Sequence, residues 1–242
     1  LKGMFAIALW DSKEEILHLI RDRFGEKPLY YGWSSNSQKN HFAFASELKS
    51  IKENSNFKNN ISRYAIGLFI KYSYVPAPLS IYENIFKLEA GSRLSIKKDY
   101  KLIKNGDSTP ANCDNFKIEK WWNLKKIVER SVSNKINDKE EAIRKTEKAL
   151  NSSVLNQSIS DVPLGSFLSG GVDSSLISAL MQKNSMKKIK TFTVGFENKD
   201  YDESSHARSV ASYIGSDHTE MFVSEREAEQ VIPNLCNIYD EP

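Results

Sequence analysis

The chain has 242 residues and a mass of 27.6 kDa, which is enough for one large domain or two of ordinary size. Hydrophobic residues make up 40% and charged residues 27%. The net charge at pH 7 is only +3, so composition gives no reason to expect a nucleic-acid partner. No apolar run reaches the roughly 18 residues of a membrane span, and no signal peptide is visible. Only two cysteines occur, so a reduced, cytoplasmic compartment is the default expectation, and no membrane partner is expected.

The first half of the sequence is rich in short apolar runs. Residues 4–10, 16–20, 29–33 and 42–45 alternate with turn-forming stretches, which predicts strands with antiparallel neighbours. A helix is expected at about residues 62–71, and two further strands near residues 93–96 and 101–103. Glu47 follows Ser46 and is expected to cap the start of a helix, with a contact to substrate as the alternative.

Two neighbouring charged residues, Arg21 and Asp22, stand at the end of the second expected strand. We interpret them as a salt bridge that fixes the loop ending at Pro28, with a role at a reactive centre as the open alternative.

The polar stretch "KNGDSTPANCDNFKI", residues 104–118, is the best linker candidate. We assign residues 106–135 to a linker, residues 1–105 to a first domain and residues 136–242 to a second. Trp121 and Trp122 are expected to anchor the chain as it leaves the first domain.

Strands and helices alternate in the second half, which favours a mostly parallel sheet with helices on its faces. Strands are expected at residues 164–168, 189–194 and 220–223. Helices are expected at residues 174–182, from Asp202 to a stop at Gly215, and from Ser224 toward Ile238. Ligands of such sheets bind beyond the carboxyl ends of the strands.

The stretch "FLSGGVDSS", residues 167–175, lies at such a carboxyl end. A strand, a Gly-Gly turn and a helix point consecutive N–H groups at one place, and the helix adds its positive dipole, so the turn favours phosphate. Ser169, Ser174 and Ser175 offer hydroxyls. Asp173 would repel phosphate but suits Mg²⁺. The turn is not a Walker A loop, since no lysine follows until Lys183.

These residues carry a resemblance to a known family. Ser169 to Ser174 is similar to the S-G-G-x-D-S pyrophosphate loop of the ATP-pyrophosphatase enzymes, and "SDVPLGSFL" narrows the resemblance to glutamine-hydrolysing asparagine synthetases. In the first half, "GMFAIALWD", "RDRFGEKPLYY" and "FASELKSI" resemble the later part of that family's glutaminase domain. "SYVPAPLSIYENIFKLEAGSRL", "TFTVGF" and "YDEP" agree as well.

The resemblance implies a fold and an activity. The first part would be the C-terminal portion of an α+β glutaminase domain with Ntn-hydrolase-type antiparallel sheets. The second would be the N-terminal portion of an α/β, parallel-sheet ATP-pyrophosphatase domain, which is adenine nucleotide α-hydrolase-like. The family uses ammonia from glutamine to amidate aspartate, through β-aspartyl-AMP, with ATP and Mg²⁺ and release of pyrophosphate.

By the same resemblance, the cofactor-binding residues are Leu168, Ser169, Gly170, Gly171, Asp173, Ser174 and Val194. Asp173 would hold Mg²⁺. Leu168 and Val194 would contact the adenosine, because apolar residues and free backbone at two adjacent strand ends make a slot for a flat base. For Val194, ordinary strand core is the alternative.

No catalytic residue is expected within this chain, because the family's cysteine nucleophile lies upstream of Leu1. We expect a fragment that lacks both ends of the family's domains and is inactive alone. Cys113 and Cys236 are interpreted as plain thiols without zinc-ligand spacing. Asp200, Asp202 and Glu203 resemble a metal cluster, but Asp202 suits a helix N-cap better.

The sequence is also compatible with three alternatives. One is a related amide-forming ligase, such as a β-lactam synthetase or a polysaccharide-pathway amidotransferase. Another is an inactive, truncated paralogue that only binds nucleotide or a partner. A GMP synthetase is disfavoured by the antiparallel first half. The sequence leaves the acceptor acid and the oligomeric state open, with a homodimer as one alternative.

Overall fold

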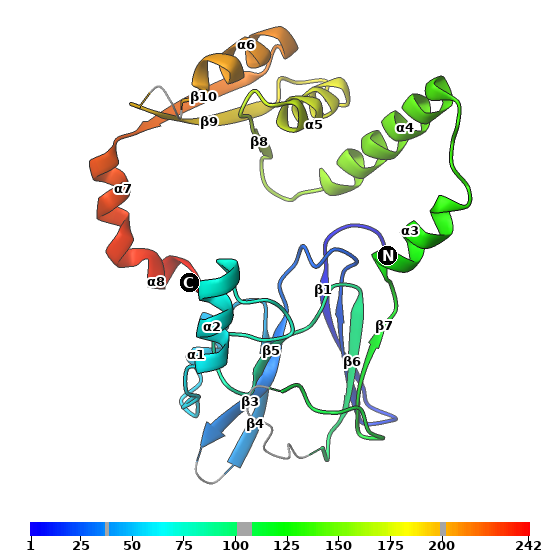
Figure 1. Ribbon diagram of the computed structural model, residues 1–242, viewed down its shortest axis with the longest axis vertical. Helices are drawn as coiled ribbons and strands as arrows, with labels where there is room; N and C mark the ends of the chain where they lie inside the picture. The colour runs from blue at the N-terminus through cyan, green and yellow to red at the C-terminus, as the bar shows by residue number, and fades with distance from the viewer. Residues whose placement is uncertain (37–38, 101–107, 199–201) are drawn as a thin grey trace. The chain divides into compact units, whose positions relative to one another are not determined.

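The computed structural model describes residues 1–36, 39–100, 108–198 and 202–242 (Figure 1). The expected strand at residues 101–103 and Asp200 lie outside the described residues. The chain divides into two compact units. One comprises residues 1–134 together with 236–242, and the other comprises residues 135–235.

The first unit holds two antiparallel sheets. One sheet has the strand order β1-β2-β6-β7 and the other has the order β4-β3-β5. The strands are β1 (Ala6–Asp11), β2 (Ile16–Arg21), β3 (Tyr30–Asn36), β4 (Lys39–Ala45), β5 (Ile85–Lys87), β6 (Ser92–Lys97) and β7 (Phe116–Lys120). The predicted antiparallel pairing is confirmed.

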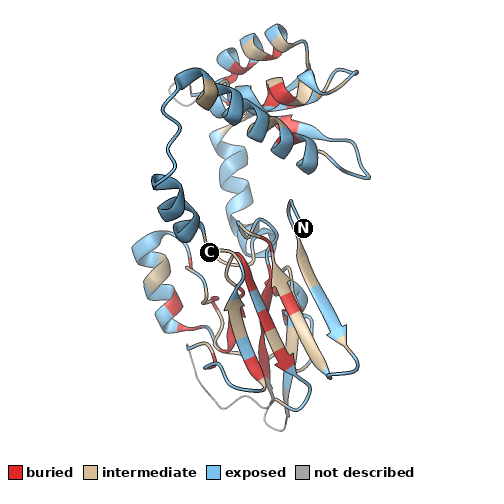
Figure 2. Ribbon diagram, turned by 90° about the vertical axis from the view of Figure 1, so that its right-hand side faces the viewer, coloured by how far each residue is buried: buried red, intermediate tan, exposed pale blue. Residues whose placement is uncertain are grey.

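The two sheets share one apolar core. Leu19, Leu94 and Phe116 from the first sheet join Tyr31 and Phe86 from the second in one buried cluster. Figure 2 shows that many positions along the strands of this unit are buried. Side chains alternate across each strand, so each sheet turns one face toward this cluster.

Helices cover the other face of the second sheet. Leu48 and Ile51 of α1 (Leu48–Lys52) and Ala65 of α2 (Arg63–Tyr72) form a second cluster with Tyr30 and Ile85. Helix α2 begins where the sequence predicts, because the Ser62 hydroxyl accepts a 3.0 Å hydrogen bond from the Ala65 N–H.

The bounds of the first unit differ from the predicted ones, since much of the expected linker is folded onto it. Strand β7 pairs with β6, and α3 (Leu124–Val132) follows before the unit ends. The N–H groups of Trp121 and Trp122 both donate to the Gly91 carbonyl. The Trp121 ring stacks on Phe5, as expected of an anchor. The polar residues before Phe116 hid the alternating pattern of this short strand.

The second unit holds a three-stranded parallel sheet of order β10-β9-β8. Its elements are α4 (Lys139–Gln157), β8 (Gly165–Phe167), α5 (Val172–Lys183), β9 (Lys190–Phe196), α6 (Ser204–Ile214), β10 (Asp217–Val223), α7 (Glu225–Val231) and the 3-10 turn η1 (Ile232–Asn234). A short helix, α8 (Leu235–Ile238), leads back to the first unit. The predicted parallel sheet is confirmed.

Local signals set the ends of these helices. Ser224 and Glu227 form a complete capping box at α7, and Asp138 caps α4 through the Glu141 N–H at 2.6 Å. Gly215 ends α6 with a φ of 73°. The expected helix toward Ile238 is interrupted at η1, where Pro233 removes a backbone donor. Among the described helices, none is both long and apolar enough to span a membrane.

Candidate functional site

The glycine turn lies between β8 and α5, at the carboxyl end of β8. The Leu168 N–H continues the parallel ladder by donating to the Phe192 carbonyl at 2.9 Å. The Thr193 hydroxyl donates to the Leu168 carbonyl. Both backbone groups of Leu168 are therefore used, and the expectation of free backbone at this residue is wrong.

Serine side chains hold the turn in shape. The Ser174 hydroxyl lies 2.9 Å from the Ser169 hydroxyl and accepts from the Ser169 N–H at 3.2 Å. The Gly171 N–H donates to the Ser169 hydroxyl at 3.3 Å. These hydroxyls remain exposed, so they can exchange an internal partner for a ligand oxygen.

Gly170 is required by its backbone and by its neighbours. Its φ is +81°, a region that other residues enter at a cost. A Cβ here would lie 2.7 Å from the Ala207 nitrogen and 2.7 Å from the His206 Cβ, both in α6. The start of α6 thus packs directly on the turn and keeps the turn close to the sheet.

Helix α5 offers hydrogen-bond donors at the turn. The N–H groups of Val172, Asp173 and Ser174 begin the helix and have no intrahelical acceptor. The Gly171 N-cap has no side chain to satisfy them. The Ser175 hydroxyl is buried and has no hydrogen-bond partner among the described residues. Donors in surplus beside a positive dipole fit an anion such as phosphate.

Asp173 adds a carboxylate to the first turn of α5. It is exposed, and no described residue forms a hydrogen bond or an ion pair with it. Its predicted role as a metal ligand stays a prediction. Within the described ranges, no group of three or more His, Cys, Asp or Glu residues could hold a metal ion. An ion there would need oxygens from a ligand as well as from Asp173.

A cavity of about 250 Å³ opens beside the turn. It is lined by Phe167, Leu168, Ser169, Ser174, Phe192, Thr193, Val194 and Glu203. Four of the predicted binding residues, Leu168, Ser169, Ser174 and Val194, thus face one cavity. The Val194 side chain is 45% exposed, which argues against an ordinary core position. Leu168 is only 1% exposed, because its side chain packs with Ala207 and Ala211.

Sequence reasoning missed several residues of this cavity. Phe167 and Phe192 are both exposed, at 80% and 38%, so both present apolar surface at the strand ends. Glu203 takes the N-cap position of α6, and Asp202 accepts from the Ser204 N–H at 3.1 Å and from its hydroxyl. Helix-capping chemistry at α6 was expected, but the helix begins at Ser204, two residues after Asp202.

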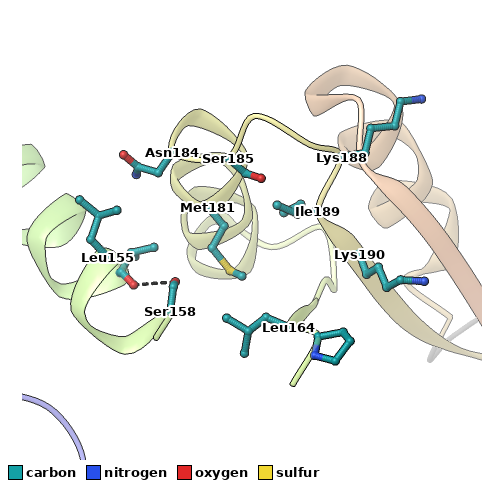
Figure 3. A pocket seen from close by; sticks show the side chains of 11 residues that line it. Leu155, Ser158, Leu164, Met181, Asn184, Ser185, Lys188, Ile189 and Lys190 are labelled. Carbon is teal, nitrogen blue, oxygen red and sulfur yellow. Dashed lines mark hydrogen bonds between the residues drawn. The ribbon is translucent and has the colours of Figure 1, made fainter. Parts of the chain in front are cut away.

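Two larger cavities of the second unit lie along α4 and α5. One of about 370 Å³ is lined partly by Leu164, Met181, Ile189 and Lys190 (Figure 3). Leu164 and Ile189 precede β8 and β9, so this cavity lies at the amino ends of the strands. The turn at residues 168–171 lies at the opposite, carboxyl end, where parallel sheets bind their ligands.

In the first unit, Asp22 organises the loop that follows β2. Asp22 is 1% exposed, and its carboxylate accepts from the N–H groups of Phe5, Phe24, Glu26 and Lys27 at 2.9–3.3 Å. Burial alone would raise the pKa of Asp22. The N–H groups around it, first those of Lys27 and Glu26, outweigh burial and hold the pKa below its ordinary value.

Arg21 stabilises the same loop by binding its carbonyl groups. Its guanidinium donates to the carbonyls of Gly25, Lys27 and Leu88 at 2.6–2.9 Å. The two neighbours therefore fix the loop through backbone groups, and the salt bridge expected between Arg21 and Asp22 is absent among the described ion pairs. The side chains of these two adjacent residues bind different backbone groups instead of each other, and the sequence alone does not show which groups these are.

The two cysteines, Cys113 and Cys236, are both exposed. Cys113 exchanges backbone hydrogen bonds with Phe116 just before β7. Neither residue lines the cavity beside the glycine turn.

Comparison with known proteins also divides the chain into two parts. Residues 1–105 match the family model described as a glutamine amidotransferase domain, and residues 145–242 match the model described as asparagine synthase. The chain therefore belongs to the class of proteins in which a glutamine amidotransferase domain is followed by an asparagine synthase domain.

Individual relatives sharpen the assignment. The chain is 36% identical over 99% of its length to a putative glutamine-hydrolysing asparagine synthetase 2 of Methanocaldococcus jannaschii. It is 32% identical over its whole length to glutamine-hydrolysing asparagine synthetase 1 of Bacillus subtilis. The chain belongs to the glutamine-hydrolysing asparagine synthetase family. It spans 42% and 34% of the length of these two relatives.

Proposed function

We propose that the whole protein makes asparagine from aspartate, with ATP as the energy source and glutamine as the nitrogen donor. The observation that carries the proposal is the glycine turn, where the first N–H groups of α5 have no intrahelical acceptor and Ser169 and Ser174 line a cavity. It is supported by family membership across both units. We also propose that the protein acts in the cytoplasm, where ATP and free amino acids are available.

The turn would bind the pyrophosphate portion of ATP. Ser169 and Ser174 would donate their hydroxyls, and the N–H groups at the start of α5 would bind further oxygens. The buried Ser175 hydroxyl, which lacks a partner within the described chain, is available to support the same oxygens. The turn has no Walker A lysine, which suits a pyrophosphate that leaves as one piece.

Asp173 would hold Mg²⁺ beside the bound phosphates. A carboxylate oxygen is a preferred Mg²⁺ ligand, and the ion usually takes only one or two protein carboxylates with the rest from phosphate and water. An exposed Asp173 without a described partner fits that requirement. When bound, Mg²⁺ would neutralise charge on the departing pyrophosphate.

The apolar side of the cavity would hold the adenosine. Phe167, Phe192 and Val194 present exposed apolar surface beside Leu168 at the ends of β8 and β9. A flat base gains contact with such surface while water is excluded. We propose that aspartate is activated here as β-aspartyl-AMP, and that this unit has the ATP-pyrophosphatase fold.

The first unit would belong to the glutaminase part of the protein, with an Ntn-hydrolase-type arrangement of its two sheets. Arg21 and Asp22 would act there as positioning residues, since both are bonded to backbone groups of the loop up to Lys27. We propose no catalytic nucleophile among the residues of this chain.

The activity is tested with the full-length protein, ATP, Mg²⁺ and glutamine. The proposal requires that aspartate yields asparagine with equal amounts of AMP and pyrophosphate, measured by chromatography and a pyrophosphate assay. Other carboxylic acids serve as matched acceptors. Product from another acid but not from aspartate would assign a related amide-forming ligase, and release of ADP and phosphate would contradict the proposed chemistry.

A further inference from the structure

The chain after the second unit returns to the first unit and is bound there by two acidic side chains. Residues 236–242 belong to the first unit (Figure 1). The Asp240 carboxylate accepts hydrogen bonds from the Leu48 N–H at 2.8 Å and the Lys49 N–H at 3.1 Å. These N–H groups open α1, whose N-cap residue Glu47 forms no capping bond. Asp240 thus supplies the cap that Glu47 was expected to give.

Glu241 is held more deeply than Asp240. Its carboxylate forms an ion pair with Lys87 and accepts a 2.9 Å hydrogen bond from the Ile81 N–H. The side chains of Lys87 and Glu241 are only 16% and 11% exposed. Lys87 also donates to the Val75 carbonyl at 2.6 Å, so its own position is fixed by the first unit.

The environment of Glu241 shows how far it is removed from water. Burial raises the pKa of Glu241 above its ordinary value, against the opposing effects of Lys87 and the Ile81 N–H. A buried carboxylate without partners would be strongly unfavourable, whereas exposed ion pairs contribute little. The segment therefore depends on Lys87 and Ile81 to stay in this position.

The chain passes between the two units at two places, and the contact of Asp240 and Glu241 lies at the second of them. The second unit, residues 135–235, is continuous with the first unit at both of its ends. At the first end, Trp121 and Trp122 are bonded to the Gly91 carbonyl. At the second end, Asp240 and Glu241 provide the polar contacts described above.

We propose that Asp240 and Glu241 form an acidic anchor that fixes the second connection between the units to a receptor surface on the first. This surface consists of Lys87 and the N–H groups of Leu48, Lys49 and Ile81. Its occupant is the chain's own Asp-Glu pair. Resting on the proposed function, the anchor keeps glutamine hydrolysis in step with ATP-dependent use of the ammonia, because it holds the end of this connection on the first unit instead of leaving it free.

Amide hydrogen exchange in the full-length protein tests the anchor itself. Glu241→Gln removes the charge but keeps the size, and Lys87→Met removes the partner while Lys87→Arg retains a cation. Glu119→Gln is the control, because Glu119 pairs with Arg93 at 2.7 Å on the same unit but on an exposed surface. All variants are compared with wild type in peptides covering residues 48–52 and 79–87.

The anchor predicts about tenfold faster exchange in these two peptides for Glu241→Gln and Lys87→Met, since a hydrogen bond to a charged group is lost. Lys87→Arg and Glu119→Gln should exchange like wild type. Combining Lys87→Met with Glu241→Gln should add less than the sum of the two changes. Wild-type exchange in both Glu241→Gln and Lys87→Met would overturn the anchor.

The same proteins are then assayed for coupling. Glu241→Gln should raise the amount of glutamate formed per pyrophosphate about threefold or more, with glutamate release itself unchanged. Faster exchange with an unchanged ratio would keep the anchor and refute its role in coupling. If wild type makes no asparagine, the proposed function fails, and hydrogen exchange alone decides whether the anchor stands.

Discussion

Two sharp backbone reversals of this protein use their hydrogen bonds in opposite ways. In the loop after β2, Asp22 accepts from four backbone N–H groups and Arg21 donates to three carbonyls, so both charged groups bind the chain itself. In the turn after β8, the N–H groups that open α5 have no intrahelical acceptor, and Asp173 is exposed without a hydrogen-bond or ion-pair partner among the described residues.

Structural charges and ligand-binding charges can be separated by asking whether their hydrogen bonds are complete within the fold. A conspicuous charged residue whose bonds are complete within the fold needs no ligand to explain it. A cluster of N–H donors with an unpaired carboxylate is hydrated when no ligand is present. The donors can then bind an anion while the carboxylate binds a cation.

The largest effect is expected at Asp22. Asp22→Ala leaves four N–H groups without their acceptor, and we expect the first unit to lose about 3 kcal/mol of unfolding free energy. Urea denaturation followed by tryptophan fluorescence measures this, because all tryptophans of this chain lie within residues 1–134. Asp11→Ala is the control, since Asp11 accepts only two N–H groups in an exposed turn. A loss below that of Asp11→Ala would contradict the account of the satisfied loop.

The glycines of the open turn should respond unequally. Gly170→Ala must hold a φ of +81° and brings a Cβ within 2.7 Å of a backbone nitrogen, so we expect a loss of about 2 kcal/mol. Gly171→Ala has a φ of −68° and meets only the Ser169 hydroxyl at 3.3 Å, so its cost should stay below about 1 kcal/mol. Hydrogen exchange in residues 204–214 measures both. Equal costs would remove the argument that α6 packs on Gly170.

Acid should weaken the satisfied loop. Because the folded pKa of Asp22 is held below its ordinary value, its carboxylate stabilises the fold at neutral pH, and this stability is lost as pH falls below about 4. The difference in unfolding free energy between wild type and Asp22→Asn should therefore shrink between pH 6 and pH 3, in roughly the range set by a carboxyl pKa. A difference that stays constant over this range would show that the Asp22 charge does not contribute.

The smallest effect is expected at the cysteines. Cys113→Ser and Cys236→Ser should leave glutamate release by the full-length enzyme within about twofold of wild type. Both cysteines are exposed, and neither is expected to be the nucleophile. A folded single variant that releases no glutamate would overturn this assignment.

The sequence predicted the fold class of each half because its signals are local. Alternating apolar runs with short turns lead to β1 and β2, and capping pairs such as Ser224 with Glu227 mark helix ends directly. The glycine turn was equally visible, since its residues are contiguous. Contacts between distant residues were not visible. The cap of α1 comes from Asp240, 192 residues after Leu48, and the adjacent Glu47 pairs with Lys49 instead.

Parts of the site could not be predicted, because they also depend on contacts between residues that are distant in the sequence. Phe192 and Thr193 belong to β9, and only the pairing of β8 with β9 brings them beside Leu168. The strand β7 was not predicted, because the stretch before it is polar. Its pairing with β6 extends the first unit beyond the predicted end at residue 105. Local chemistry was therefore easier to predict than the neighbours that complete it.

The most direct test of the open turn is Asp173→Asn in the full-length enzyme, with glutamate and pyrophosphate measured side by side. If Asp173 holds Mg²⁺ on the leaving pyrophosphate, pyrophosphate release should fall about 10²- to 10³-fold while glutamate release persists. Asp161→Asn, an exposed aspartate before β8 in the same unit, should leave both rates unchanged. If Asp173 only favours the start of α5, asparagine would serve nearly as well. Near-normal pyrophosphate release from Asp173→Asn would contradict the central claim that the turn binds a metal–pyrophosphate group.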